Sequence, residues 1–229
     1  MKYAAEVMKA YLVVQPAPAE EFEEMFDDAL ELIAYCARVS NPANQFNTDT
    51  GEKLIRRLIE WKHWSPLEMC SATIGIDTTR DIARQILRHR SFSFQEFSQR
   101  YADPSTLDDT FVLREARLQD PKNRQNSIPC EDLEIQKAWA MKQMQVIHEA
   151  QLAYKWAISK GIAKEQARCI LPEGNTVSRI YMNGTLRSWV HYIELRSGNG
   201  TQKEHMEVAR AVAEAIAKIF PMVKEFVND

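Results

Sequence analysis

The residues best suited to chemistry lie in one stretch, Arg88–Tyr101, which reads RHRSFSFQEFSQRY. Two arginines flank a histidine, and a Glu-x-Ser-x-Arg run closes the stretch. The arginine guanidinium recognises phosphate and carboxylate groups in a bidentate way and stays charged when it is partly buried. Ser98 could donate a hydrogen bond to a phosphate oxygen, and Glu96 could accept one from a ribose hydroxyl. The stretch therefore predicts a site for an anionic, ring-containing ligand.

The overall charge of the chain indicates that an anion-binding site can occupy only a small part of the surface. The chain has 229 residues, a formal net charge of −3 and an isoelectric point near 6.0. A surface that binds nucleic acid throughout would carry an excess of basic residues. Single-stranded nucleic acid, which arginine and aromatic side chains also bind together, is therefore the less favoured alternative. We expect no nucleic-acid partner.

No part of the sequence predicts a membrane or secreted protein. The apolar runs fall short of the ~18 residues that a bilayer-spanning helix needs, and the first residues do not form the apolar region of a signal peptide. The four cysteines (Cys36, Cys70, Cys130 and Cys169) are scattered, without a Cys-x-x-Cys pair. Such cysteines are typical of buried free thiols in a reducing compartment. We expect a cytoplasmic protein with no membrane partner.

Missing motifs exclude several familiar kinds of site. The chain has seven glycines and neither Gly-x-Gly-x-x-Gly nor Gly-x-x-x-x-Gly-Lys, so a glycine-rich phosphate loop is not expected. The five histidines show no His-x-x-x-His spacing, and no metal site is expected. A Gly-x-Ser-x-Gly elbow is also missing. Arginine is left as the main ligand-binding residue type.

Hydrophobic periodicity predicts the elements that would position these residues. The expected helices cover residues 19–39, about 49–59, 81–89, 131–160, 163–170, 185–195 and 201–220. The expected strands cover residues 3–14, 69–78, 92–100 and 177–181, with a short one at 110–113. Residues 103–109 and 119–129 have the composition of loops. Glu52 and Glu204 are expected to take part in capping the second and the last helix.

Two of these elements would gather polar side chains. The helix over residues 81–89 would carry a stripe of three arginines: Arg80, Arg84 and Arg88. This stripe is open to two interpretations, a solvated basic face or an anion site. The strand over residues 92–100 would point three polar groups to one side: Glu96, Ser98 and Arg100.

No internal repeat, low-complexity tract or linker divides the chain. The mixture of strands and helices predicts an α+β fold. We expect one domain over residues 1–229, with an antiparallel sheet and several long helices.

The spacing Arg88-His89-Arg90, seven residues, then Ser98-x-Arg100 resembles the signature of flavin-dependent thymidylate synthases. Three further segments resemble that family, so that the similarity covers roughly residues 50–210. They are HWSPLE at His63–Glu68, RCILP at Arg168–Pro172, and the run from Leu186-Arg187-Ser188-Trp189 to Glu194-Leu195-Arg196.

The resemblance implies a reaction and its cofactors. Members of this family make dTMP from dUMP, with methylenetetrahydrofolate as the carbon donor. FAD carries the hydride, and NADPH or NADH reduces the flavin again. The family architecture is an α+β homotetramer whose sites form where subunits meet.

The resemblance also implies roles for individual residues. The expected dUMP contacts are Gln85, Arg88, Glu96, Ser98, Arg100, Arg168 and Arg196. The expected FAD contacts are Ser65, Arg88, His89, Arg90, Glu96, Thr185, Arg187 and His191. Arg196 is the expected catalytic residue, since a guanidinium facing N3 and a carbonyl of uracil would stabilise negative charge on the ring.

Some of these roles have alternatives. The family often has Asn two residues before the arginine that matches Arg187, where this chain has Thr185, with Asn183 further back. Either residue could be the flavin contact. Arg168 could instead bind the last carbonyls of its short helix, and His191 could be a partly buried structural histidine.

Overall fold

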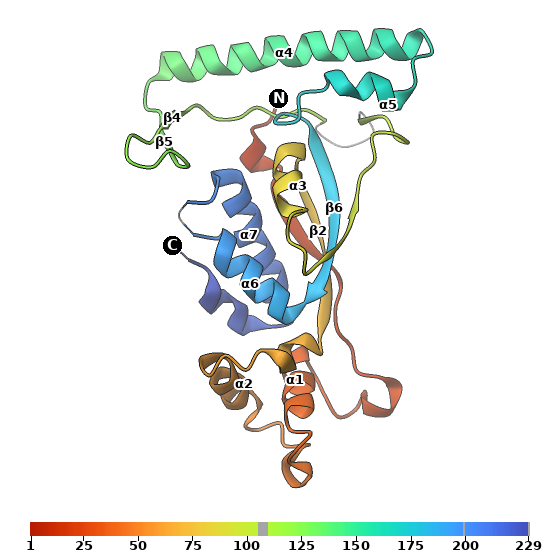
Figure 1. Cartoon of the computed structure of the whole chain (residues 1–229), viewed down its shortest axis with the longest axis vertical. Coiled ribbons are helices and arrows are strands. Elements are labelled where there is room, and N and C mark those ends of the chain that lie inside the picture. Colours follow the sequence, from red (N-terminus) through yellow and green to blue (C-terminus); the bar gives the residue numbers. More distant parts are fainter. Residues whose placement is uncertain (105–109, 199, 229) are drawn as a thin grey trace.

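The centre of the fold is a four-stranded antiparallel sheet with the strand order β1-β2-β6-β3 (Figure 1). The computed structural model describes residues 1–104, 110–198 and 200–228. The four strands are β1 (Lys9–Val14), β2 (Ser71–Thr79), β6 (Val177–Thr185) and β3 (Ser93–Glu96). Strands β2 and β6 pair along their whole lengths, from Ser71 with Thr185 to Thr79 with Val177.

One face of this sheet is covered by helices α6 (Leu186–Arg196) and α7 (Lys203–Ile216) (Figure 1). Alternate strand residues point to that face, because successive side chains of a strand point to opposite sides. Ile74 and Ile180 on the strands are fully buried, as are Trp189 and Val212 on the helices. These side chains belong to the main hydrophobic core.

Further elements lie at the two ends of the sheet (Figure 1). Helices α1 (Ala29–Ala37) and α2 (Gly51–Glu60) pack together at one end. At the other end lie α4 (Leu133–Ser159), α5 (Lys164–Ala167) and the hairpin of β4 (Arg117–Gln119) and β5 (Ser127–Pro129). Helix α3 (Arg80–Ile86) directly follows β2. Short 3-10 helices are η1 (Ala4–Glu6), η2 (Glu20–Phe22), η3 (Pro42–Asn44), η4 (Ser65–Glu68), η6 (Arg168–Ile170) and η7 (Pro221–Phe226).

The expected α+β fold with an antiparallel sheet is confirmed. The expected strand over 69–78 and the expected helices over 81–89, 131–160 and 185–195 match β2, α3, α4 and α6 closely. Helix α4 begins after Asp132, whose carboxylate accepts from two backbone N–H groups of the first turn. It ends before Gly161, which takes the positive φ of 76° that a helix C′ position favours.

Several expected boundaries are wrong, including the end of the strand over 177–181, which runs to Thr185. The helix over 19–39 begins only at Ala29, because the Asp28 carboxylate caps it by accepting from Glu31 N at 2.9 Å. The strand over 3–14 begins only at Lys9, after the 3-10 turn η1. The strand over 92–100 ends at Glu96, and Tyr101 N donates to Ser98 O at 3.1 Å in a turn.

Two expected caps are also wrong. Glu52 makes an ion pair with Arg56 on the surface of α2 instead of capping it. Glu204 lies in the first turn of α7, and its Oε1 is 2.9 Å from Arg114 Nη1.

The short strand expected at residues 110–113 does not form as a strand. Phe111 and Leu113 make isolated bridges there instead. Of the loop expected at 103–109, residues 105–109 lie outside the described residues.

Helix α4 buries only one part of its surface. Ile147, Tyr154 and Ala157 pack on a second, smaller core with residues such as Leu171. Trp139 and other large apolar side chains remain exposed, with Trp139 at 45%.

No helix within the described ranges has both the length and the apolar character that a membrane crossing requires.

Candidate functional site

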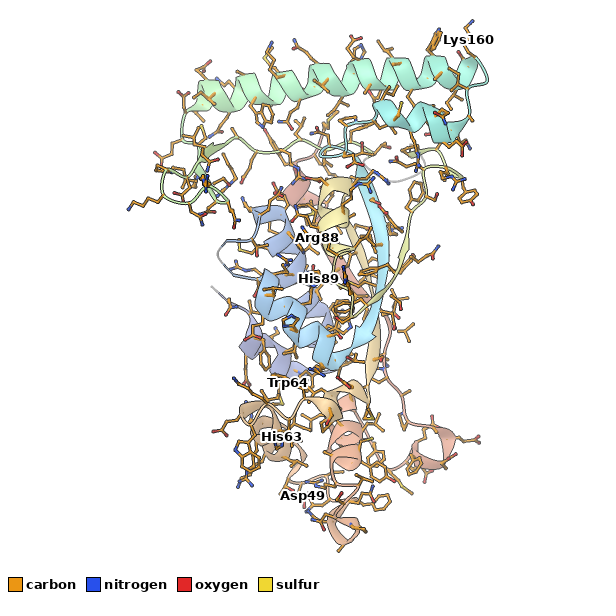
Figure 2. The ribbon with its side chains drawn as sticks, in the orientation of Figure 1. Asp49, His63, Trp64, Arg88, His89 and Lys160 are labelled. Carbon is orange, nitrogen blue, oxygen red and sulfur yellow. The ribbon has the colours of Figure 1, made fainter. Side chains whose placement is uncertain are left out.

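Helix α3 positions His89. Ile82 and Ile86 are fully buried and hold α3 against the sheet, and His89 N donates to Ile86 O at 3.0 Å where the helix has ended. Figure 2 shows Arg88 and His89 in the middle of the molecule, near α6. The His89 ring packs edge-on against Tyr192 of α6, with the ring centroids 4.9 Å apart.

His89 accepts a hydrogen bond from Arg196. Arg196 Nε lies 3.1 Å from His89 Nε2, and a guanidinium can only donate. His89 Nε2 is therefore unprotonated, and a neutral His89 carries its proton on Nδ1. Burial, together with the charges of Arg196, His191 and Arg88, lowers the pKa of His89 to about 4. His89 is neutral at pH 7 and does not repel the Arg196 cation.

A second histidine continues this cluster. His205 of α7 is fully buried, with Nε2 3.1 Å from the Tyr192 hydroxyl and Nδ1 3.2 Å from Gln85 Oε1. Burial, and then the charges of Arg196 and His89, lower the pKa of His205 to about 3. We call Gln85, His89, Tyr192, Arg196 and His205 the central cluster. It brings together three predicted site residues: Gln85, His89 and Arg196.

Arg187 and His191 lie on the exposed side of α6, one turn apart, and border a hollow of about 690 Å³. Its lining consists of Lys62, Trp64, Glu68, Ser91, Arg187, Ser188, Val190, His191 and Glu194. Arg187 Nη1 forms a hydrogen-bonded ion pair with Glu68 Oε1. Figure 2 shows Trp64 close to the end of α6 that faces α2. We call this hollow the α6 hollow.

Other predicted flavin contacts lie around the α6 hollow but do not line it. Ser65 is exposed on η4, next to the lining residue Trp64, and Arg90 is exposed after His89. Thr185 is the N-cap of α6, since its side chain accepts from Ser188 N at 3.3 Å. Asn183 donates to Thr73 Oγ1 at 2.8 Å on the opposite face of the sheet from the core.

A third group gathers near α5. Arg100 Nη2 lies 3.4 Å from Glu165 Oε2, and Arg168 Nε donates to Glu165 O at 3.4 Å. Ser98 forms the turn that leads to Arg100, so Ser98, Arg100 and Arg168 are all close to this part of the chain. The contact of Arg168 with Glu165 O is the helix-carbonyl contact that the sequence left open as its alternative role. We call these three residues the α5 group.

Glu96 connects β3 to the middle of the sheet. Its Oε1 accepts from Ser178 Oγ at 2.9 Å and lies 3.5 Å from Arg80 Nη1. Because β3 ends at Glu96, the expectation that Glu96, Ser98 and Arg100 share one strand face is wrong. Glu96 points toward buried Arg80, whereas Arg100 points toward α5.

The arginine stripe of α3 is not a uniformly solvated face. Arg80 is 7% exposed and pairs with Glu96, and Arg84 Nη2 lies 2.6 Å from Glu173 Oε1. The two carboxylates remove most of the repulsion that three like charges would cause. Arg88 stays exposed at the end of the helix, next to the central cluster.

The aromatic residues of the Arg88–Tyr101 stretch contribute to the core. The Phe92 ring lies 4.6 Å from the Trp189 ring and 6.5 Å from the His89 ring, measured between centroids. Phe92 and Phe94 pack against the main core. These rings therefore hold the His89 loop against α6.

The sequence did not indicate the role of the residues around His205. Tyr192 lies on the buried face of its helix, where its spacing alone predicts a core residue, and Glu204 is expected only as a cap. One signal was available: His205 stands on the α7 face that continues with Val208 and Val212, where a histidine is unexpected.

Cysteines and metals are not part of this arrangement. All four cysteines are free, but only Cys70 and Cys130 are buried as expected, while Cys169 is exposed. Burial raises the pKa of the Cys70 thiol to about 12, so this thiol is not ionised at neutral pH. Over residues 1–104, 110–198 and 200–228, no three His, Cys, Asp or Glu side chains gather as a metal site.

The fold is shared with a solved pyrimidine nucleotide methylase. The UMP/dUMP methylase PolB from Streptomyces cacaoi, solved with bound 5-Br dUMP, matches with a TM-score of 0.79 and 25% sequence identity. The match covers 96% of this chain and 93% of that chain. The same methylase bound with 5-Br UMP matches with a TM-score of 0.76 at 23% identity.

Comparison of the sequence with known proteins identifies the family more closely than the fold does. Residues 22–222 match the family model of thymidylate synthase complementing protein. A probable flavin-dependent thymidylate synthase of Paramecium bursaria Chlorella virus 1 is 50% identical over 87% of this chain and 91% of its own length. A flavin-dependent thymidylate synthase of Synechocystis is 50% identical over 84% of this chain and 86% of its own length. The chain belongs to the thymidylate synthase complementing protein family, which confirms the family resemblance.

Proposed function

We propose that the chain is a flavin-dependent thymidylate synthase. It would methylate dUMP reductively to dTMP, taking the carbon from methylenetetrahydrofolate and the reducing equivalents from NADPH or NADH through FAD. The family membership and the two relatives at 50% identity support this activity.

The observation that carries the proposal is the contact between Arg196 and His89. Arg196 Nε donates to Nε2 of neutral His89 at 3.1 Å. This leaves both Nη groups of Arg196 to bind a ligand. A planar pair of N–H groups suits the N3 and carbonyl edge of a uracil ring. Positive charge held there would stabilise negative charge that develops on the ring during the reaction.

The remaining dUMP contacts would come from two places in the fold. Gln85 and Arg196 belong to the central cluster and Arg88 lies next to it, while Ser98, Arg100 and Arg168 form the α5 group. Glu96 lies between them on β3. We propose that a complete dUMP site combines the central cluster of one copy with the α5 group of another. A homotetramer with shared sites would meet this requirement.

The α6 hollow has side chains that suit a flavin dinucleotide. Arg187 and Lys62 offer positive charge for the pyrophosphate, and Ser91 and Ser188 offer hydroxyl groups. Trp64 offers an apolar ring at the same hollow. The proposed FAD contacts are Ser65, Arg88, His89, Arg90, Glu96, Thr185 or Asn183, Arg187 and His191. Bound FAD would supply hydride transfer.

The Arg187 ion pair and the position of His89 bear on how the proposed ligands would bind. Arg187 is neutralised in part by Glu68, so an incoming phosphate would compete with that carboxylate for the guanidinium. His89 belongs to the central cluster, where its ring packs against Tyr192 and Phe92. Since His89 holds Arg196 and is itself a proposed flavin contact, it would link the proposed nucleotide and flavin positions.

Purified protein tests the proposal. It should be yellow, with flavin absorption near ~450 nm, and should oxidise NADPH faster when dUMP is present. With methylenetetrahydrofolate added, mass spectrometry should find dTMP. The same assay with UMP in place of dUMP shows whether the protein also accepts UMP, as the name of the methylase of similar fold suggests for that enzyme. A protein that binds no added FAD and forms no dTMP would contradict the proposal.

A related flavin enzyme could place a different one-carbon group on the pyrimidine. The mass of the product distinguishes the two reactions, since a hydroxymethyl product carries one oxygen more than a methyl product.

A further inference from the structure

A continuous chain of hydrogen bonds runs from the buried Tyr192 through Gln85 to the buried Glu204. The Tyr192 hydroxyl lies 3.1 Å from His205 Nε2, and His205 Nδ1 lies 3.2 Å from Gln85 Oε1. Gln85 Nε2 donates to Gln202 Oε1 at 2.8 Å. Gln202 Nε2 then donates to Glu204 Oε2 at 2.9 Å.

The ionised Glu204 fixes the direction of every bond in this chain. Its side chain is largely buried, and its Oε1 lies 2.9 Å from Arg114 Nη1. Burial alone would raise the pKa of Glu204, but the Arg114 charge and the hydrogen bonds outweigh burial and hold that pKa below its usual range. A carboxylate without a proton only accepts. Gln202 must therefore turn its NH₂ group to Glu204 and its oxygen to Gln85.

The orientation of the Gln202 amide in turn determines the orientation of Gln85 and the tautomer of His205. With its NH₂ group donating to Gln202, Gln85 turns its oxygen to His205, so His205 must carry its proton on Nδ1. His205 Nε2 is then free to accept from the Tyr192 hydroxyl. One tautomer and one amide orientation satisfy all of these contacts, whereas a turned Gln85 amide would place its oxygen against the Gln202 oxygen.

Gln85 is the member of the chain that a ligand at the central cluster can reach. Its oxygen and one N–H are engaged inside the protein, which leaves the second N–H as the group that can bind. We propose that His205 is a positioning residue that holds the Gln85 amide so that it offers an N–H donor to the nucleotide. Gln85 would then select an acceptor atom, a carbonyl or phosphate oxygen, and reject a donor.

This inference rests on the proposed function for the identity of the ligand. The direction of the hydrogen bonds at His205 does not depend on the proposed function. It can be measured in the ligand-free protein by ¹⁵N NMR of the His205 ring. We expect a protonated shift at Nδ1 and an unprotonated shift at Nε2. The opposite tautomer would overturn the inference, whether or not the protein makes dTMP.

Two variants separate positioning from a purely structural role. In His205→Asn the amide nitrogen takes the place of Nδ1 and can still donate to Gln85, while the contact to Tyr192 is lost. In His205→Gln the longer side chain reaches the Tyr192 hydroxyl in place of Nε2 and loses the contact to Gln85. Both variants replace a buried ring with a smaller amide, so thermal unfolding should show similar losses of stability.

Nucleotide binding should distinguish the two variants. We expect the KM for dUMP to rise about tenfold in His205→Gln, the loss of roughly one hydrogen bond, with flavin content unchanged. His205→Asn should stay within about threefold of wild type. Equal KM values in the two variants would overturn the inference. If the wild-type protein makes no dTMP, the proposed function fails, and the NMR result still decides the tautomer.

Discussion

At the scale of single residues, His89 and Arg196 form the contact on which the proposed chemistry depends. Arg196 is partly buried, and its Nε is held by a histidine that stays neutral at pH 7. A guanidinium held on one side loses less rotational freedom when it binds a ligand on the other side. The pair therefore resembles a preorganised electrostatic site, which has its largest effect where charge develops during reaction.

Arg196→Ala should abolish most turnover while the protein keeps its flavin. Removing one preorganised donor of this kind lowers kcat by roughly 10²–10³-fold, and Arg196 does not line the α6 hollow. Steady-state dTMP formation and the flavin absorption of the purified variant measure the two effects. Equal loss of flavin would show that Arg196 has a structural role instead.

The two buried histidines predict how stability depends on pH. The pKa of His89 is lowered from 6.5 to about 4 and that of His205 from 6.5 to about 3. As the pH falls below 6.5, the unfolded chain takes up protons that the folded chain does not, so the free energy of unfolding decreases toward pH 3–4. Above pH 6.5 this contribution is fully present.

Urea unfolding of wild type and His205→Asn between pH 4 and 7 tests this dependence. The variant should lose stability less steeply as the pH falls, because one of the two groups that titrate differently is gone. Identical slopes would show that His205 does not contribute.

Sequence alone located the residues that carry charge but not those that orient them. Arg88, His89 and Arg196 stand in spaced motifs, and such spacing can be recognised without a structure. His205 and Tyr192 could not be found this way, because a buried hydrogen bond joins residues from different helices whose packing the sequence does not state. Glu204 was assigned to a cap for the same reason: Arg114, its partner, lies far away in the sequence.

At the scale of elements, the close approach of the His89 loop to β6 depends on Gly184. A Cβ built on Gly184 would lie 2.4 Å from Phe92 Cδ1, far inside van der Waals contact. The Phe92 ring also contacts Trp189 of α6. Glycine at this position thus allows Phe92 to anchor the segment that carries Arg88 and His89.

Gly184→Ala should destabilise the protein by about 1–3 kcal/mol, because overpacking forces the Phe92 ring to move. Gly174→Ala is the matched control, since its nearest neighbour would be Asp81 Oδ2 at 3.9 Å. Urea unfolding of both variants gives the comparison. Equal losses would mean that the contact with Phe92 is not the cause.

Periodicity predicted the elements whose packing is simple and misjudged those with competing local contacts. Strand β2 and helix α3 follow from alternation and from a buried Ile82–Ile86 face. The start of α1 was misjudged because the Asp28 side chain caps the helix there, while the acidic residues before Asp28 resemble a first helical turn in the sequence. The end of β3 was misjudged because a turn at Ser98 replaces strand pairing, and alternation of residue types does not reveal a turn.

At the scale of the whole molecule, the predicted site residues fall into separate groups. The central cluster and the α6 hollow lie around α6, whereas the α5 group lies at the end of the sheet that carries α4 (Figure 1). Helix α4 also exposes a set of large apolar side chains: Leu133, Ile135, Trp139, Met141, Met144, Val146, Leu152 and Trp156. An exposed apolar surface of this kind often marks a protein interface. Both observations support the proposed homotetramer.

Mixing two inactive variants tests whether sites are shared between copies. Arg196→Ala disables the central cluster, and Arg168→Ala disables the α5 group. If each site combines these two parts from different copies, unfolding and refolding the variants together should restore activity to about a quarter of wild type, because each half is intact in about half of the copies. The variants refolded separately and then assayed side by side are the control. If one chain supplied both parts, the co-refolded mixture would stay as inactive as the separate variants.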